Sequence, residues 1–141
     1  MNSKDLADYG FGAWLPFYLD GEAYLLARLP NEPGVYAVRS KRALARLRGE
    51  SDLLYVGKAA RVSVAKPSGL KLRIRQYYHP GWLQETSKRI RSLIASSNDY
   101  EIGWAVTPSK KQAQDLESAL LNRYVREHGE LTPENRNMPR I

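Results

Sequence analysis

The chain has 141 residues, of which 43% are hydrophobic, and it contains no cysteine. This length suits a single domain, and the lack of cysteine excludes a disulfide framework, a thiolate metal site and a cysteine nucleophile. The formal net charge is +7, and residues 39–91 alone hold fourteen Lys or Arg against three Asp or Glu. Such a segment attracts the phosphate backbone of nucleic acids, although solvated helix faces in an ordinary basic protein give the same composition.

Membrane insertion is not expected from the hydrophobic pattern. No stretch approaches the ~18 consecutive apolar residues that a transmembrane helix needs. The first residues also lack the basic and apolar regions of a secretory signal. We therefore expect a cytoplasmic protein with no membrane partner.

The first 33 residues are predicted to form an extension packed on the core of the fold. Aromatic side chains gather between residues 9 and 18, and a short helix is predicted over residues 22–29, before Pro30. The core is assigned to residues 34–141, and the whole chain is expected to form one globular domain.

Two predicted strands each carry a tyrosine. They span residues 34–39 and 52–58, and both alternate as half-buried strands do. A short basic helix, Lys41 to Arg48, is predicted between them, ending at Gly49. Because this connection is short, antiparallel pairing is expected, and it would set two phenolic hydroxyls side by side. In the first strand, Val35 and Ala37 are predicted to share one face, and Tyr36 and Val38 the other. In the second strand, Tyr55 and Gly57 are predicted to share one face, and Leu54 and Val56 the other.

The rest of the chain alternates helices with a third strand. A loop over residues 59–68 precedes a helix that ends before Pro80, and Gly129 is the stop signal of the last helix. The tail from Leu131 is predicted to be irregular. The predicted elements are helices at 69–78, about 82–96 and 110–127, and a strand at 100–106.

Arg73 lies on the apolar side of its predicted helix. The positions of Leu70, Ile74 and Tyr77 form a stripe, and Arg73 falls on it at a spacing of three from Leu70. A guanidinium placed there faces the fold. The alternative is a side chain that covers apolar surface with its stem and keeps its charge in water.

Glu117 shows the same anomaly in the long helix, with the opposite charge. It falls on the stripe that includes Ala113 and Leu120. A buried carboxylate must be protonated, paired with a cation or bound to a metal, since an isolated buried charge costs several kcal/mol or more. A structural salt bridge, most obviously with Arg73, is the alternative to a metal site.

These residues could together cleave a phosphodiester. The Glu117 carboxylate would hold a divalent cation as Lewis acid, and Arg73 would offer a planar fork to the charge developing on phosphorus. A tyrosine hydroxyl would orient or deprotonate the attacking water, and Lys58 could lower the ordinary phenol pKa of about 10. The scheme needs neither histidine nor cysteine.

At these positions the chain resembles the GIY-YIG nuclease superfamily, over roughly residues 33–137. The two strand motifs of that family are present here as Gly34-Val35-Tyr36 and Tyr55-Val56-Gly57. The resemblance continues through Lys58-Ala59, Leu70-Lys71-Leu72-Arg73, Tyr77, Leu116-Glu117-Ser118-Ala119-Leu120-Leu121 and Leu131-Thr132-Pro133-Glu134-Asn135. Five elements in the family order are far more specific than either tripeptide alone.

The resemblance implies an α+β fold, with a central three-stranded antiparallel sheet flanked by helices in a sandwich-like arrangement. It also implies hydrolysis of DNA with one Mg2+ or Mn2+ ion. By position, the water-activating residue is Tyr55, assisted by Tyr36 and Lys58, and the phosphate-stabilising residue is Arg73. Tyr77 would supply a supporting hydroxyl, and Glu117 would be the only protein ligand of the metal ion. Asn135 would steady the site from the tail.

The chain departs from the family in two intervals. The segment between the two tyrosines and the loop 59–68 are both longer than usual, and either segment could carry substrate contacts. The longer loop leaves Arg75 as an alternative to Arg73, and Asn137 is an alternative to Asn135. The apolar stripe favours Arg73, and the preceding proline in the family manner favours Asn135.

The expected partner is DNA, double-stranded or branched, and a homodimer or a separate targeting protein would select the site. Repair or processing of DNA is the leading hypothesis. A restriction-type nuclease and a noncatalytic nucleic-acid binding module of the same fold are the alternatives. The side chains expected to contact nucleic acid are Lys41, Arg42, Arg61, Lys66, Lys71, Arg75, Lys88 and Arg89.

Overall fold

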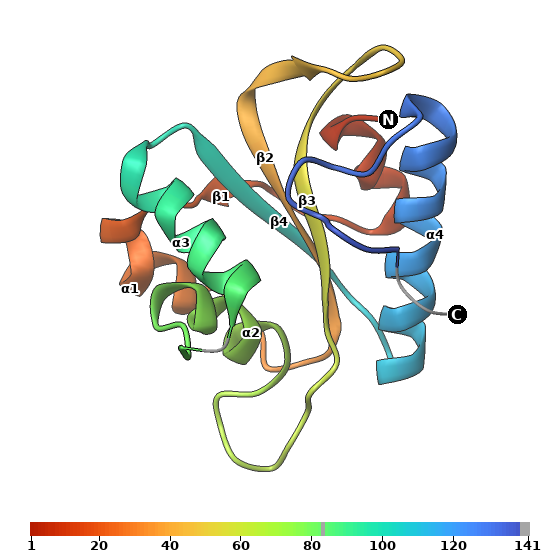
Figure 1. The fold of residues 1–141 in the computed structure, drawn as a ribbon. Coiled ribbons are helices and arrows are strands. Elements are labelled where there is room, and N and C mark those ends of the chain that lie inside the picture. Colours follow the sequence, from red (N-terminus) through yellow and green to blue (C-terminus); the bar gives the residue numbers. More distant parts are fainter. Residues whose placement is uncertain (83, 139–141) are drawn as a thin grey trace.

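The sheet has four antiparallel strands, in the order β1-β4-β2-β3 (Figure 1). The computed structural model describes residues 1–82 and 84–138. The strands are β1 (Leu15–Pro16), β2 (Gly34–Ala45), β3 (Glu50–Ala59) and β4 (Tyr100–Val106). The α+β class is as expected, but the expected number of three strands is wrong, because the N-terminal segment adds the two-residue β1 beside β4.

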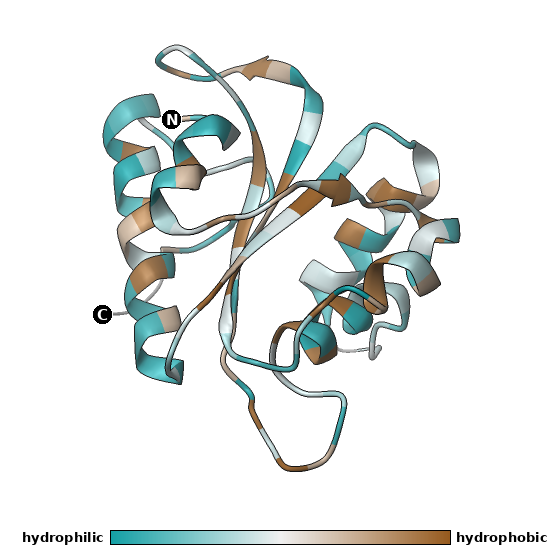
Figure 2. Cartoon of the chain, turned by 180° about the vertical axis from the view of Figure 1, so that it is seen from behind, coloured by the Kyte–Doolittle hydropathy of each residue, from teal (hydrophilic) through white to brown (hydrophobic). Residues whose placement is uncertain are grey.

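Helices cover both faces of the sheet, as Figures 1 and 2 show from opposite sides. One face carries α1 (Glu22–Leu26), α2 (Gly69–Tyr78) and α3 (Glu85–Ser96), and the other carries α4 (Lys110–His128) and the 3-10 helix η1 (Ser3–Tyr9). A 3-10 turn, η2 (Leu19–Gly21), leads into α1. Within the described ranges, no helix combines the length and the apolar character needed to cross a membrane.

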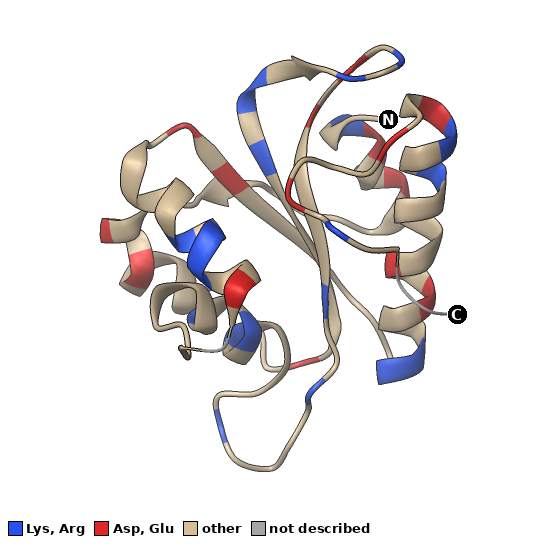
Figure 3. Ribbon diagram, viewed as in Figure 1, with Lys and Arg blue, Asp and Glu red and all other residues tan. Residues whose placement is uncertain are grey.

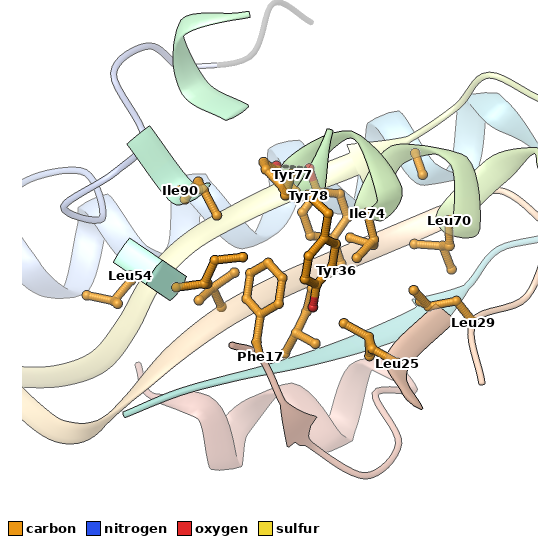
Figure 4. Close-up of a cluster of buried hydrophobic side chains, with 14 residues drawn as sticks. Phe17, Leu25, Leu29, Tyr36, Leu54, Leu70, Ile74, Tyr77, Tyr78 and Ile90 are labelled. Carbon is orange, nitrogen blue, oxygen red and sulfur yellow. Dashed lines mark hydrogen bonds between the residues drawn. The ribbon is translucent and has the colours of Figure 1, made fainter. Parts of the chain in front are cut away.

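The side chains of β2 alternate between two hydrophobic clusters. Tyr36 and Val38 lie in the cluster under α2 and α3 (Figure 4), while Val35 and Ala37 lie in the cluster under α4. This confirms the predicted faces of the first strand. The first 33 residues contribute to both clusters, with Phe17, Leu25 and Leu29 in the first and Leu6 and Phe11 in the second.

The predicted helix between the two tyrosine strands does not exist. Instead β2 continues to Ala45 and pairs with β3, with Leu44 opposite Ser51 and Ala45 opposite Glu50. The segment Lys41 to Arg48 is rich in good helix formers, but pairing with β3 overrides this weak local preference. At the hairpin tip, Arg46 forms an ion pair with Glu130, with Nη2 and Oε1 2.8 Å apart. The hairpin is thereby attached to the segment that follows α4.

A bulge in the β2–β3 pair changes one predicted face. Val38 lies opposite Tyr55, whereas the next residue, Arg39, lies opposite Leu53, so Leu54 is the extra residue. Leu54 consequently packs in the same cluster as Tyr36, and Val56 packs in the other. The prediction that Leu54 and Val56 share a face is therefore wrong, because strict alternation does not hold across a bulge.

Candidate active site

Strand β3 forms one edge of the sheet, so side chains from both of its faces can reach the same space beside that edge. Tyr55 lies opposite Val38, which faces α2 and α3, and Lys58 lies opposite Val35, which faces α4. A pocket of about 420 Å³ opens there, and Tyr55, Lys58 and Glu117 all line it. The edge position therefore joins a tyrosine from one layer with a lysine and a glutamate from the other.

Glu117 projects from α4 and is 9% exposed. Burial raises the pKa of its carboxyl group, and the nearby charges of Lys58 and Arg73 oppose that shift. Its ion-pair partner is Lys58, with Nζ 3.9 Å from Oε1. The pairing with Arg73 considered as the structural alternative is not found among the described residues.

Glu117 offers a divalent cation one carboxylate. Among residues 1–82 and 84–138, no group of three or more His, Cys, Asp or Glu side chains is arranged to hold a metal ion. Mg2+ does not need such a cage, since it binds through one or two carboxylates and keeps waters or phosphate oxygens as its other ligands. A single buried carboxylate in an open pocket, with Glu134 also on the pocket wall, therefore fits a substrate-completed Mg2+ or Mn2+ site.

Arg73 is held in place by neutral hydrogen-bond acceptors. Its Nη1 donates to Gln76 Oε1 at 3.0 Å and to Ser87 Oγ at 3.2 Å, and its guanidinium lies 4.7 Å from the centre of the Tyr77 ring. Among the described residues no carboxylate forms an ion pair with Arg73, so its guanidinium can still bind an anion. Arg73 is half-buried, whereas Arg75 on the same helix is exposed, as the apolar stripe predicted.

Arg73 lines a second pocket, of about 250 Å³, that lies next to the first. Arg73, Gln76 and Arg61 line this second pocket, and Lys58 lines both pockets. The two spaces therefore adjoin at Lys58. An anion beside Lys58 would lie between the Arg73 side and the Glu117 side of β3.

Tyr36 and Tyr77 lie behind the pocket. Both side chains are fully buried, and their hydroxyl groups are hydrogen-bonded to each other. Burial raises the pKa of both phenols, which keeps them protonated at neutral pH. The centre of the Tyr36 ring is 6.1 Å from that of Tyr55. Of the three tyrosines, Tyr55 is the one that lines the pocket, so Tyr36 and Tyr77 can support the site but are not placed to contact a ligand.

The glycines of the two tripeptides permit close approaches. A Cβ atom on Gly57 would lie 2.6 Å from Tyr36 Cζ and 2.7 Å from Tyr55 Cε2, and one on Gly34 would lie 2.3 Å from the carbonyl oxygen of Ala105. All three distances are shorter than an ordinary van der Waals contact. Gly57 therefore lets the two tyrosine rings close over β3, and Gly34 lets β2 approach β4.

Asn135 fastens the tail to the open edge of β3. Its Oδ1 accepts from the Val56 N–H at 2.9 Å, and its Nδ2 donates to the Val56 carbonyl oxygen at 2.9 Å. One residue earlier, the backbone N–H of Glu134 donates to the Leu54 carbonyl oxygen at 2.9 Å. Asn137 is exposed and lines the pocket without any such contact to β3 among the described residues. Of the two asparagines considered, Asn135 has the geometry of a residue that fixes the strand bearing Tyr55.

Several residues near the site were missed in the sequence analysis. Gln76 lies three residues after Arg73 on one helix face, and this spacing was a usable signal. Ser87 comes from α3 and is buried, so only the packing of α3 against α2 brings it to Arg73. The other missed residues on the wall of the first pocket include Thr86, Gln114 and Glu134.

The predicted nucleic-acid contacts fall into three groups (Figure 3). Arg61 lines the Arg73 pocket, Lys66 lies exposed in the same loop, and Lys71 and Arg75 lie on α2. A second group, Lys41 and Arg42, is exposed on the long hairpin. Lys41 lies five residues beyond Tyr36 along β2, which corresponds to roughly 16 Å.

The third group is engaged within the protein. Lys88 pairs with Glu85 at 3.6 Å, and Arg89 pairs with Glu134 at 3.3 Å. Arg89 also donates to the backbone carbonyl oxygen of Glu134 at 3.4 Å. Since Glu134 adjoins Asn135, Arg89 helps to hold the tail at β3.

Comparison with known proteins gives a limited similarity. The chain is 28% identical over 116 residues to UvrABC system protein C of Clostridioides difficile, and 27% identical over 118 residues to UvrABC system protein C of Clostridium botulinum. The matches cover 82% and 84% of this chain, and the chain spans 16% of the length of each relative. No family model matches the chain, and no solved structure matches it.

Proposed function

We propose that this chain is a divalent-metal-dependent endonuclease that hydrolyses phosphodiester bonds of DNA and acts in DNA repair or processing. The observation that carries this proposal is the buried carboxylate of Glu117, which opens into the same pocket as Tyr55 and Lys58. The resemblance to GIY-YIG nucleases and the similarity to UvrABC system protein C support it. Both point to DNA as the substrate.

Glu117 is the residue that would hold Mg2+ or Mn2+. When bound, the ion supplies Lewis-acid stabilisation of charge on phosphate oxygens. The Lys58 ammonium attracts the phosphate to the junction of the two pockets. In the free protein it forms an ion pair with Glu117. Arg73 presents a preorganised guanidinium to the same phosphate, held by Gln76 and Ser87.

Tyr55 is the residue that would orient the attacking water, because its side chain lines the pocket that Glu117 faces. Tyr36 and Tyr77 stay protonated behind it and fix its surroundings. Asn135 acts as a positioning residue, since it holds the backbone of β3 next to Tyr55.

Nicking of supercoiled plasmid tests the proposal. Purified chain is incubated with plasmid and Mg2+ or Mn2+, or with EDTA, and compared with Glu117→Gln. The matched control is Asp115→Asn, since Asp115 lies on the same helix with 63% of its side chain exposed and pairs only with Lys111 among the described residues.

We expect metal-dependent nicking by the wild type and by Asp115→Asn, and none by Glu117→Gln. Salt-sensitive DNA binding that is unaffected by metal and unaccompanied by cleavage would contradict the proposal and favour a noncatalytic binding module. Discrete plasmid fragments would favour a restriction-type enzyme.

A further inference from the structure

Three exposed apolar side chains lie in the loops whose other residues line the pocket of Arg73. Val64 is 98% exposed, Trp82 is 79% exposed and Val62 is 50% exposed. We call these three residues the apolar rim. Single exposed hydrophobic residues are common on protein surfaces. This rim is distinguished by its place, because it belongs to the two loops that lead into α2 and into α3.

Both loops border the Arg73 pocket directly. Val62 and Val64 lie in the loop 60–68, whose first residues, Ala60 and Arg61, line that pocket. Trp82 lies in the turn between α2 and α3, and Gln84, two residues later, lines the same pocket. The loop 60–68 projects from the fold at the bottom of Figure 2, where its hydrophobic parts are drawn in brown.

The turn that carries Trp82 is fastened while its indole stays exposed. The Lys88 ammonium donates a hydrogen bond to the Trp82 carbonyl oxygen. The backbone N–H of Gly81 donates to Gln84 Oε1 at 2.9 Å. These bonds hold the backbone of the turn, so the ordering cost when a partner binds is largely that of the indole side chain itself.

The positive charge around the apolar rim favours a negatively charged partner. Residues 58–82 contain six Lys or Arg and no Asp or Glu. Arg61 and Lys66 flank Val62 and Val64 along the loop, and both basic side chains are exposed. Aromatic or apolar side chains interleaved with basic ones fit nucleic acid, in which flat bases alternate with phosphates.

We propose that Trp82 stacks on an unpaired DNA base next to the phosphate bound at the Arg73 pocket, and that Val62 and Val64 offer further apolar surface on the neighbouring loop. The inference rests on the proposed function, which places a DNA phosphate at Arg73. It adds that Trp82 binds a base next to that phosphate. In regular duplex DNA the base faces are covered by their neighbours, so a base must be unpaired or mismatched before an indole can reach it at low cost. The apolar rim therefore assigns the protein to DNA with disrupted pairing near the phosphate bound at the pocket.

Fluorescence anisotropy in EDTA tests this inference separately from cleavage. A fluorescein-labelled short duplex is compared with the same duplex containing a central mismatched bubble. The proteins are the wild type, Trp82→Ala, Trp82→Phe and the control Leu47→Ala. Leu47 is 75% exposed and lies at the tip of the β2–β3 hairpin, so Leu47→Ala removes an exposed apolar side chain that is not part of the apolar rim.

We expect the wild type to bind the bubble more tightly than the duplex. Trp82→Ala should raise the Kd for the bubble by at least about fivefold, whereas Trp82→Phe, which keeps a stacking ring, should stay within about twofold. The Kd for the regular duplex should change little, and Leu47→Ala should match the wild type on both DNAs. A 2-aminopurine placed in the bubble should be quenched by the wild type and not by Trp82→Ala.

The inference is overturned if Trp82→Ala binds both DNAs as the wild type does, or loses affinity equally for both. The first result would show that Trp82 does not contact the DNA, and the second would show that Trp82 affects binding without distinguishing an unpaired base. Because no metal is present, an inactive but bubble-selective protein would refute the nuclease proposal alone. An active nuclease without bubble selectivity would refute this inference alone.

Discussion

The two sides of strand β3 differ in how their polar groups are satisfied. On the α2 side, Tyr36 and Tyr77 bond to each other, and Arg73 bonds to Gln76 and Ser87. On the α4 side, the ion-pair partner of Glu117 in the described part of the chain is Lys58, at 3.9 Å, and Glu117 faces an open pocket. The polar groups on the α2 side are therefore already hydrogen-bonded, whereas the Glu117 carboxylate on the α4 side can still bind a cation.

This difference assigns different tasks to the two sides. Preorganised donors stabilise developing charge without rearrangement during a reaction. A partly desolvated carboxylate is instead costly to ionise until a cation arrives. The α2 side is thus suited to hold the phosphate, and the α4 side to recruit the metal ion.

Replacing Arg73 should have the largest effect. Arg73→Ala removes the preorganised guanidinium, and we expect the nicking rate to fall roughly 100- to 1,000-fold. Arg73→Lys should restore little, because an ammonium cannot reproduce the planar fork. The measurement is the single-turnover rate of plasmid nicking.

The control for this change is Arg75→Ala, on the exposed side of the same helix. It should weaken DNA binding and lower the slope of log K against log salt by about 0.9, as expected for one lost phosphate contact. A larger loss of nicking in Arg75→Ala than in Arg73→Ala would reverse the assignment.

Gly57→Ala should disturb the α2 side next most strongly. The added methyl group would push apart Tyr36 and Tyr55, and we expect a loss of about 1–3 kcal/mol in the free energy of unfolding, together with loss of nicking. Urea unfolding measures the first effect. Gly12→Ala is the matched control, because nothing lies within 4 Å of its added Cβ. Equal stability of the two variants would show that the rings are not closely packed over Gly57.

Asn135→Ala should loosen the edge of β3. Loss of both hydrogen bonds to Val56 should cost about 1–2 kcal/mol in the free energy of unfolding and reduce nicking. Asn137→Ala should leave stability nearly unchanged, since Asn137 is exposed. The comparison is again made by urea unfolding, and the opposite ranking would make Asn137 the positioning residue.

Glu117→Gln should give the smallest effect on stability, with a characteristic pH dependence. Burial raises the pKa of Glu117 above its ordinary value of 4.5, so the unfolded chain ionises at lower pH than the folded protein. Stability therefore falls as pH rises above that value. In metal-free buffer the variant should be more stable than the wild type at neutral pH and equal to it well below pH 4.5.

Mg2+ should stabilise the wild type and not Glu117→Gln, because only the wild type binds the ion in its folded state. Thermal unfolding with and without Mg2+ measures this difference. A variant that is less stable than the wild type at neutral pH would instead show that the ion pair with Lys58 outweighs the cost of burial.

Local patterns in the sequence predicted much of the fold. The bounds of α2 and β4 were predicted as found, and α4 extends one residue beyond its predicted end, with Gly129 in the left-handed conformation that terminates it. Helical periodicity with stop signals predicted the two helices, and alternation of side chains predicted β4. The apolar stripes also placed Arg73 and Glu117 on inward faces.

Other features depended on contacts between distant segments. The segment Lys41 to Arg48 has high helix propensity, yet it extends a hairpin because β3 supplies its backbone partners. The bulge at Leu54 and the pairing of β1 with β4 also had no local signal. Similarly, Glu117 pairs with Lys58 rather than Arg73 because β3 lies between the helices that carry Glu117 and Arg73.

A crystal structure of Glu117→Gln bound to an oligonucleotide would test the central claim most directly. That claim is that both sides of β3 act on one phosphate at the junction of the two pockets. We predict a phosphate within hydrogen-bond distance of Arg73 and Lys58, with Tyr55 and the substituted residue facing it. Backbone phosphates confined to the hairpin around Lys41 and Arg42, with the pockets beside β3 free of DNA, would contradict the account.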